Sequence, residues 1–89
     1  MATKTFKIGE YAVGGIIKVS VNNGLVTIQA LDWNTKEIVE QEHFKASIQN
    51  LGKMLRFLES DLTSYYYADQ IMPWIREQMN VPKNHIIWD

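Results

Sequence analysis

Residues 16–31 read IIKVSVNNGLVTIQAL, and this stretch decides the fold. Apolar and polar residues alternate on both sides of Asn23-Gly24, which is the pattern of half-buried strands. Asn-Gly readily adopts the positive φ angles that a tight primed turn requires. The stretch therefore predicts an antiparallel hairpin with strands over residues 16–21 and 25–33.

Further strands are predicted on both sides of this hairpin. Residues 5–8 form a short alternating run that ends at Gly9, and residues 37–44 follow a turn-forming segment at 32–36. Glu40, Gln41 and Glu42 place the last strand at a solvated or edge position. Because short loops join only antiparallel neighbours, residues 3–44 are predicted to form an antiparallel β-meander of three to four strands.

After Phe44 the apolar period becomes helical. A first stripe about 120° wide contains Ile48, Leu51, Met54, Leu55, Leu58 and Leu62. A second stripe, about 180° wide and rotated from the first, contains Tyr65, Tyr67, Ala68, Ile71, Met72, Trp74, Ile75 and Met79. Two helices over residues 47–79, packed on one face of the sheet, follow from these stripes, with a turn near residues 60–64.

Two prolines bear on the second half of the chain. Pro73 lies inside the second stripe, where it removes a backbone hydrogen bond, so we expect a kink or a break there. Val81-Pro82 ends helical structure. Residues 84–88 then form either a short apolar tail or a short strand at the sheet edge.

Composition indicates one α+β domain over residues 1–89. The chain has no cysteine, so its fold depends on apolar packing or self-association, and its 9 basic and 10 acidic residues give a net charge of −1. No electrostatic field steers a polyanion to such a chain, which argues against nucleic acid. No apolar run reaches the roughly 18 residues of a membrane span, so we expect a cytoplasmic protein without a membrane partner.

The glycines of residues 9–15 have the spacing of a phosphate-binding loop. In that motif a lysine and a hydroxyl residue follow the last glycine of the loop, but here these positions are Gly15 and Ile16. The segment is therefore interpreted as a flexible loop or a bulge that enters the next strand.

No catalytic, metal or cofactor site is predicted. Glu40 and Glu42 alternate with His43 along one strand, so the carboxylates and the imidazole point to opposite faces, and His85 is the only other histidine. The chain contains neither a cysteine nucleophile nor a Gly-x-Ser-x-Gly elbow. We therefore expect a protein that is not an enzyme.

The aromatic residues of the helical half indicate a surface for binding. Tyr65, Tyr66 and Tyr67 are consecutive, so on a helix they point about 100° apart and at least one faces outward. Phe57 lies about 60° outside the first apolar stripe, and the second stripe is wider than packing on a sheet requires. The predicted interface consists of Phe57, Tyr65, Tyr66, Trp74 and Ile75.

These features predict a non-enzymatic protein-binding module that acts through the helical surface. It would form a homodimer or cover a site on a partner, as small phage or mobile-element proteins do with host proteins. The alternative is a single-stranded nucleic-acid-binding domain that stacks bases on exposed aromatics. The lysines and arginines count against that alternative, because they are scattered among acids along the sequence.

Overall fold

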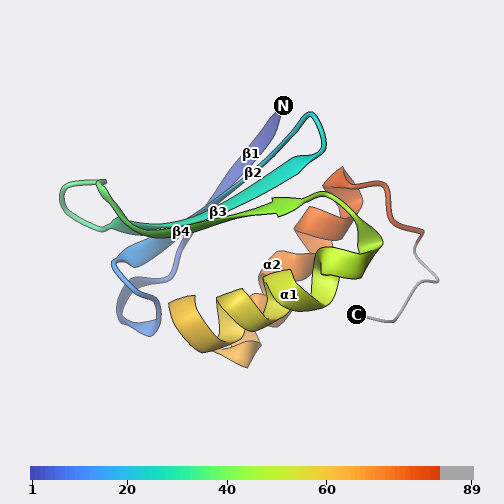
Figure 1. Cartoon of the computed structure of the whole chain (residues 1–89). Coiled ribbons are helices and arrows are strands. Elements are labelled where there is room, and N and C mark those ends of the chain that lie inside the picture. The colour runs from blue at the N-terminus through green and yellow to red at the C-terminus, as the bar shows by residue number, and fades with distance from the viewer. Residues whose placement is uncertain (83–89) are drawn as a thin grey trace.

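A four-stranded antiparallel sheet carries two helices on one face (Figure 1). The computed structural model describes residues 1–82, so the tail or strand expected at residues 84–88 lies outside the described part of the chain. The sheet has the order β1-β2-β3-β4 and the bounds β1 (Ala2–Lys7), β2 (Gly15–Asn22), β3 (Leu25–Asp32) and β4 (Ile38–Lys45). The predicted α+β class and its order, a meander followed by two helices, are confirmed.

The central hairpin forms as its sequence predicts. Asn22 pairs with Leu25, and the two residues between them have positive φ angles of 49° at Asn23 and 78° at Gly24. These values belong to a type I′ turn, whose twist matches that of the strands it joins. The turn fixes the register of β2 on β3, and with it the face to which every side chain of the hairpin points.

One face of the sheet forms the core. Ile17 pairs with Ala30 and Val19 with Ile28, so the alternation of β2 and β3 brings their buried residues to the same side. The buried core contains Ile17, Val19, Val26, Ile28, Ala30, Leu51, Met54, Phe57, Leu58, Leu62, Ala68, Ile71, Met72 and Ile75. The two helices therefore cover this face.

The opposite face of the sheet is polar over most of its area. Its side chains pair across strands, with hydrogen bonds from Thr3 to Ser20 (3.2 Å) and from Gln29 to Gln41 (3.1 Å). Ile16 is buried on this face and does not belong to the core cluster. Such cross-strand pairs suit a face that remains in contact with water.

The first helical segment is not a uniform α-helix. It passes from the 3₁₀ turn η2 (Ile48–Asn50) through α1 (Leu51–Arg56) into the π-helical segment η3 (Phe57–Leu62). The N–H of Thr63 donates to the carbonyl of Leu58, five residues earlier, at 2.8 Å. The chain then leaves the helix at Thr63 and Ser64, inside the predicted turn at residues 60–64.

The helix α2 (Tyr65–Gln78) continues through Pro73, so of the two expected alternatives, a kink or a break, the break is wrong. Pro73 and Asp69 both lie on the exposed side of α2, where the carbonyl released by the proline can bond to water. The buried side carries Ile71, Met72 and Ile75, whose packing holds the helix together across the proline. Apolar contacts on one side thus outweigh the loss of one hydrogen bond on the other.

A Schellman motif ends α2 before Pro82 is reached. Asn80 has a φ of 60°, its N–H donates to Glu77, and the N–H of Val81 donates to Arg76. An asparagine tolerates this left-handed position better than most residues. Asn80, and not Pro82, therefore ends the helix α2.

Two glycines with similar backbone angles differ in their surroundings, which gives a matched test. Gly24 (φ 78°) has open space where a Cβ would lie, whereas a Cβ on Gly14 (φ 71°) would lie 2.5 Å from the carbonyl oxygen of Leu31. We expect Gly24→Ala to lower the free energy of unfolding by about 1–2 kcal/mol, the cost of the left-handed conformation. Gly14→Ala should cost about 3 kcal/mol or more, because it adds a clash with backbone.

Urea unfolding of the wild-type protein and both variants measures the difference. Equal losses for the two alanines would show that the β1–β2 loop does not approach Leu31 of β3 at Gly14 as closely as described.

Candidate functional site

The structure places Phe57 in the core, so the expectation of an exposed Phe57 is wrong. Its side chain is 8% exposed, and its ring centroid lies 6.0 Å from that of Phe44 on β4. The helical projection treats only one stripe as buried, but Phe57, the first residue of η3, packs on Phe44 of β4 outside that stripe. A helix that packs on a wide sheet can therefore bury side chains on both sides of its central apolar stripe.

The other predicted interface residues divide into two groups. Ile75 is fully buried, and Trp74 is half-buried against the core. Tyr65 and Tyr66, in the first turn of α2, are 57% and 66% exposed. The predicted helical surface is thus reduced to these two tyrosines.

The exposed apolar side chains gather at one end of the molecule, opposite the Asn23-Gly24 turn. Within residues 1–82, seven of the nine large exposed hydrophobic residues lie there. They come from the β1–β2 loop, the β3–β4 turn with the start of β4, and the start of α2; in Figure 1 the β3–β4 turn projects farthest to the left, with the β1–β2 loop below it. We call this surface the aromatic end; it comprises Tyr11, Val13, Trp33, Ile38, Val39, Tyr65 and Tyr66.

Hydrogen bonds attach the β1–β2 loop to the helical turn. The N–H of Val13 donates to the carbonyl of Leu62 at 2.8 Å, and the hydroxyl of Thr63 donates to the carbonyl of Tyr11. The ring of Tyr11 stacks on that of Tyr67 at 5.8 Å, and Tyr67 meets Tyr66 edge to face at 5.0 Å. Segments about 50 residues apart in sequence therefore form one aromatic row.

Backbone contacts at Gly14 and Gly15 connect this loop to the β3–β4 turn. The N–H of Trp33 donates to the carbonyl of Gly14 at 2.7 Å, and a Cβ on Gly14 would lie 2.8 Å from a methyl group of Val39. Gly15 lies beside the side chain of Trp33. The glycines thus allow the second part of the aromatic end to pack closely against the first.

The turn that presents Trp33 is held by Asp32. Its carboxylate accepts hydrogen bonds from the N–H groups of Thr35 (2.9 Å) and Asn34 (2.8 Å), and these bonds hold the pKa of Asp32 below its ordinary value. The ammonium group of Lys36 lies 5.7 Å from the centre of the Trp33 ring and donates to the Trp33 carbonyl. Trp33 is therefore exposed on an ordered turn.

Sequence reasoning missed Tyr11, Trp33 and Val39. Tyr11 belongs to the loop predicted at residues 9–15, and Trp33 and Val39 fall within the predicted strands 25–33 and 37–44. A bulky apolar residue inside a loop or turn was an available signal, because such residues are rarely needed for packing there.

The described residues contain no group of acids and histidines that could hold a metal ion. Glu42 pairs with Ile28 on the core-facing side of the sheet, whereas His43 pairs with Thr27 on the other side. His43 forms a hydrogen bond with the Thr27 hydroxyl at 3.0 Å. The predicted separation of these carboxylates and the imidazole onto opposite faces is therefore confirmed.

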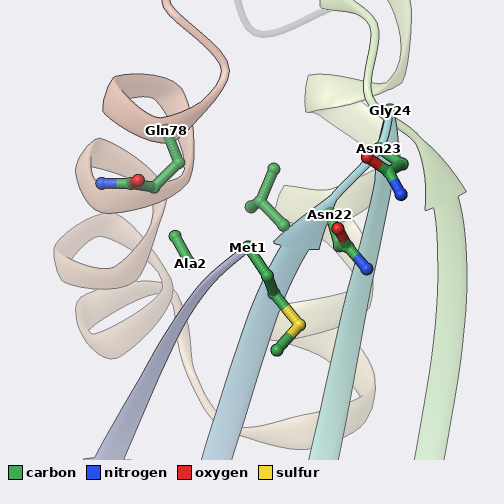
Figure 2. A pocket seen from close by; sticks show the side chains of 7 residues that line it. Met1, Ala2, Asn22, Asn23, Gly24 and Gln78 are labelled. Atoms are coloured by element: carbon green, nitrogen blue, oxygen red, sulfur yellow. The ribbon is translucent and has the colours of Figure 1, made fainter.

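A hollow of about 440 Å³ lies at the other end of the molecule (Figure 2). The N-terminus, the tip of the central hairpin and the last turn of α2 surround it. Its lining residues are Met1, Ala2, Val21, Asn22, Asn23, Gly24 and Gln78. None of these has a side chain that acts as a general acid, base or nucleophile at neutral pH.

No family model, curated protein or solved structure matches this chain. The longest helix in residues 1–82 is α2, with 14 residues, and no helix in that range has the length and apolarity to cross a membrane. Any functional proposal therefore depends on the residues and their geometry.

The burial of Phe57 and the exposure of Tyr66 lead to opposite expectations. Phe57→Ala removes a ring packed on Phe44, so the free energy of unfolding should fall by about 3–5 kcal/mol. Tyr66→Ala removes an exposed ring with one aromatic neighbour and should cost less than about 1 kcal/mol. Thermal and urea unfolding distinguish the two, and a Phe57→Ala variant as stable as Tyr66→Ala would contradict the core position of Phe57.

The Asp32 turn predicts a dependence of stability on pH. Because the pKa of Asp32 is lower in the folded state, its contribution is complete above the ordinary carboxyl pKa of about 4 and is lost as the pH falls through the folded value. Asp32→Ala should therefore be less stable than wild type at neutral pH, and this difference should shrink in acid. Asp32→Asn keeps an acceptor oxygen, so it should lose less stability at neutral pH than Asp32→Ala and should lack the pH dependence that Asp32 contributes. If the difference in unfolding free energy between wild type and Asp32→Ala stayed constant with pH, the assigned role of Asp32 would be excluded.

Proposed function

We propose that this protein is a non-enzymatic protein-binding module whose contact surface is the aromatic end. The observation that supports the proposal is the collection of exposed tyrosine, tryptophan and aliphatic side chains from three separate segments. Soluble proteins seldom leave large apolar side chains concentrated in one region unless the region binds something. Tyrosine and tryptophan are also enriched at protein interfaces, where they provide rigid apolar area with a polar group.

The order of this surface supports binding by a preformed site. Asp32 and Lys36 hold the turn of Trp33, and the loop of Tyr11 is bonded to Leu62 and Thr63. A surface fixed before binding loses less conformational entropy when the partner docks. The anchors expected to contribute most are Trp33, Tyr11 and Tyr66, because large aromatic residues dominate most measured interfaces.

The charges near the aromatic end favour a protein over single-stranded nucleic acid. Glu10 and Glu37 are exposed there beside Lys36, so the surface has no excess of positive charge. Single-stranded nucleic acid is bound by aromatic stacking together with a basic groove that follows the phosphates. A surface of this kind suits the role expected from the size and type of the chain, that of a small protein that covers a site on a host protein.

The proposal is tested by measuring partner binding with single alanine variants of Tyr11, Trp33 and Tyr66. A partner is first captured with the wild-type protein, identified and purified, and its affinity is then measured by calorimetry. We expect at least one variant to weaken binding about 30-fold, corresponding to about 2 kcal/mol for an anchor residue. The circular dichroism of each variant should remain that of the wild type.

Leu25→Ala is the matched control, because Leu25 is an exposed apolar residue beside the hairpin turn at the opposite end. It should leave the affinity unchanged. Equal affinity in all three folded aromatic variants would refute the aromatic end as the contact surface. Binding of an oligonucleotide that weakens steeply with salt would instead support the nucleic-acid alternative.

A further inference from the structure

Among the described residues 1–82, the strand β4 is an edge of the sheet. It has eight residues, and within residues 1–82 it pairs only with β3. All its residues are exposed except Phe44, which is half-buried. An edge of this length presents unpaired N–H and C=O groups that can accept a further strand.

The core-facing side of this edge is acidic. Glu40 pairs with Ala30 and Glu42 with Ile28, so both carboxylates project on the side that carries the helices, and both are exposed. The helices therefore do not extend far enough to cover them. They repel an incoming strand that is acidic on that side and attract one that carries a positive charge there.

The opposite edge of the sheet is basic on the same side. Lys4 of β1 pairs with Val19, a core residue, and its ammonium group lies 5.3 Å from the centre of the Phe6 ring. Lys4 therefore projects on the core-facing side, as Glu40 and Glu42 do. β1 contains lysines at positions 4 and 7 and no acid.

These charges discriminate between the ways in which two copies can join their edges. Pairing β4 with β4 about a two-fold axis at Gln41 places Glu40 of each copy opposite Glu42 of the other. Pairing β1 with β1 brings the two Lys4 side chains to the same side of the joined sheet. Like charges facing each other across strands are destabilising, whereas opposite charges are stabilising. Only pairing of β1 with β4 matches opposite charges.

We propose that the protein self-associates head to tail, with β1 of one copy added to the β4 edge of the next. In the meander β1 and β4 run antiparallel, so a translated copy presents β1 in the antiparallel direction with its helices on the same side. Setting Lys4 opposite Glu42 aligns residues 2–7 with residues 39–44. This register also sets Ala2 opposite Phe44 and Thr5 opposite Gln41, while Phe6 lies opposite Glu40 and Lys7 opposite Val39.

The resulting contact is heterologous, since it uses two different surfaces of the same chain. Repeating such a contact gives open chains of molecules unless rotation closes a ring. The edge contact shares Val39 with the aromatic end, but its charged residues Lys4, Glu40 and Glu42 lie outside that surface. Loss of one activity therefore does not require loss of the other.

Sedimentation velocity of the full chain over a range of concentrations at low salt tests the proposal. We expect the weight-average mass to rise at least about twofold with concentration and to fall again when about 0.5 M salt screens the ion pairs. Lys4→Glu and the double variant Glu40→Lys/Glu42→Lys should each remain monomeric under the same conditions. A wild-type protein that stays monomeric throughout overturns the proposal.

Mixing the two charge-reversed proteins gives the most specific test of the proposed contact. Lys4→Glu retains an acidic β4 that fits the basic β1 of the double variant, and its own acidic β1 fits the basic β4 of the double variant. An equimolar mixture should therefore recover the mass distribution of the wild type. Failure to recover while both proteins remain folded contradicts pairing of these edges.

Matched controls make the same charge changes elsewhere. Lys18→Glu reverses a lysine on the polar face of a central strand, and Glu10→Lys/Glu77→Lys reverses two exposed acids away from the edges. Both should assemble as the wild type does. Equal loss of assembly in these controls would assign the effect to net charge and reject the edge contact.

Discussion

The structure depends on covering the single apolar face of the β2–β3 hairpin. Val19 and Ile28 are paired at its centre and are fully buried, and the chain has no disulfide to support a smaller core. Burial of each large aliphatic side chain contributes about 1.5–3 kcal/mol, so exposure of this face would leave the sheet without a source of stability. The two helices fold back on the same side of the sheet because only that side is apolar.

One-sided packing accounts for the surfaces that remain open. Within residues 1–82, the helices cover the centre of the sheet and the Phe44 end of β4, and most side chains of the two edge strands remain exposed. The edges carry charges on the core-facing side, at Lys4 and at Glu40 and Glu42, where full helical coverage would have required apolar residues. Because the two helices do not cover most of the edge strands, these strands remain exposed and can carry charged residues.

The aromatic end arises from the same geometry. In a meander covered by an αα unit, the β1–β2 loop, the β3–β4 turn and the turn between the helices all lie at one end. The hydrogen bonds of Val13 and Thr63 then fix the distance between the loop and the helices. Together these segments present exposed apolar side chains on a hydrogen-bonded backbone.

The sequence by itself determined the strands, the hairpin register and the two helical segments, because alternation and turn chemistry act between close neighbours along the chain. Asn23-Gly24 needed no distant contact to specify its turn. The tertiary structure decided which side chains remain exposed. Phe57 became buried because Phe44 lies across from it, and α2 continued through Pro73 because its other side is packed. Tyr11 and Trp33 became part of one surface because segments distant in sequence meet there, and no local pattern encodes that meeting.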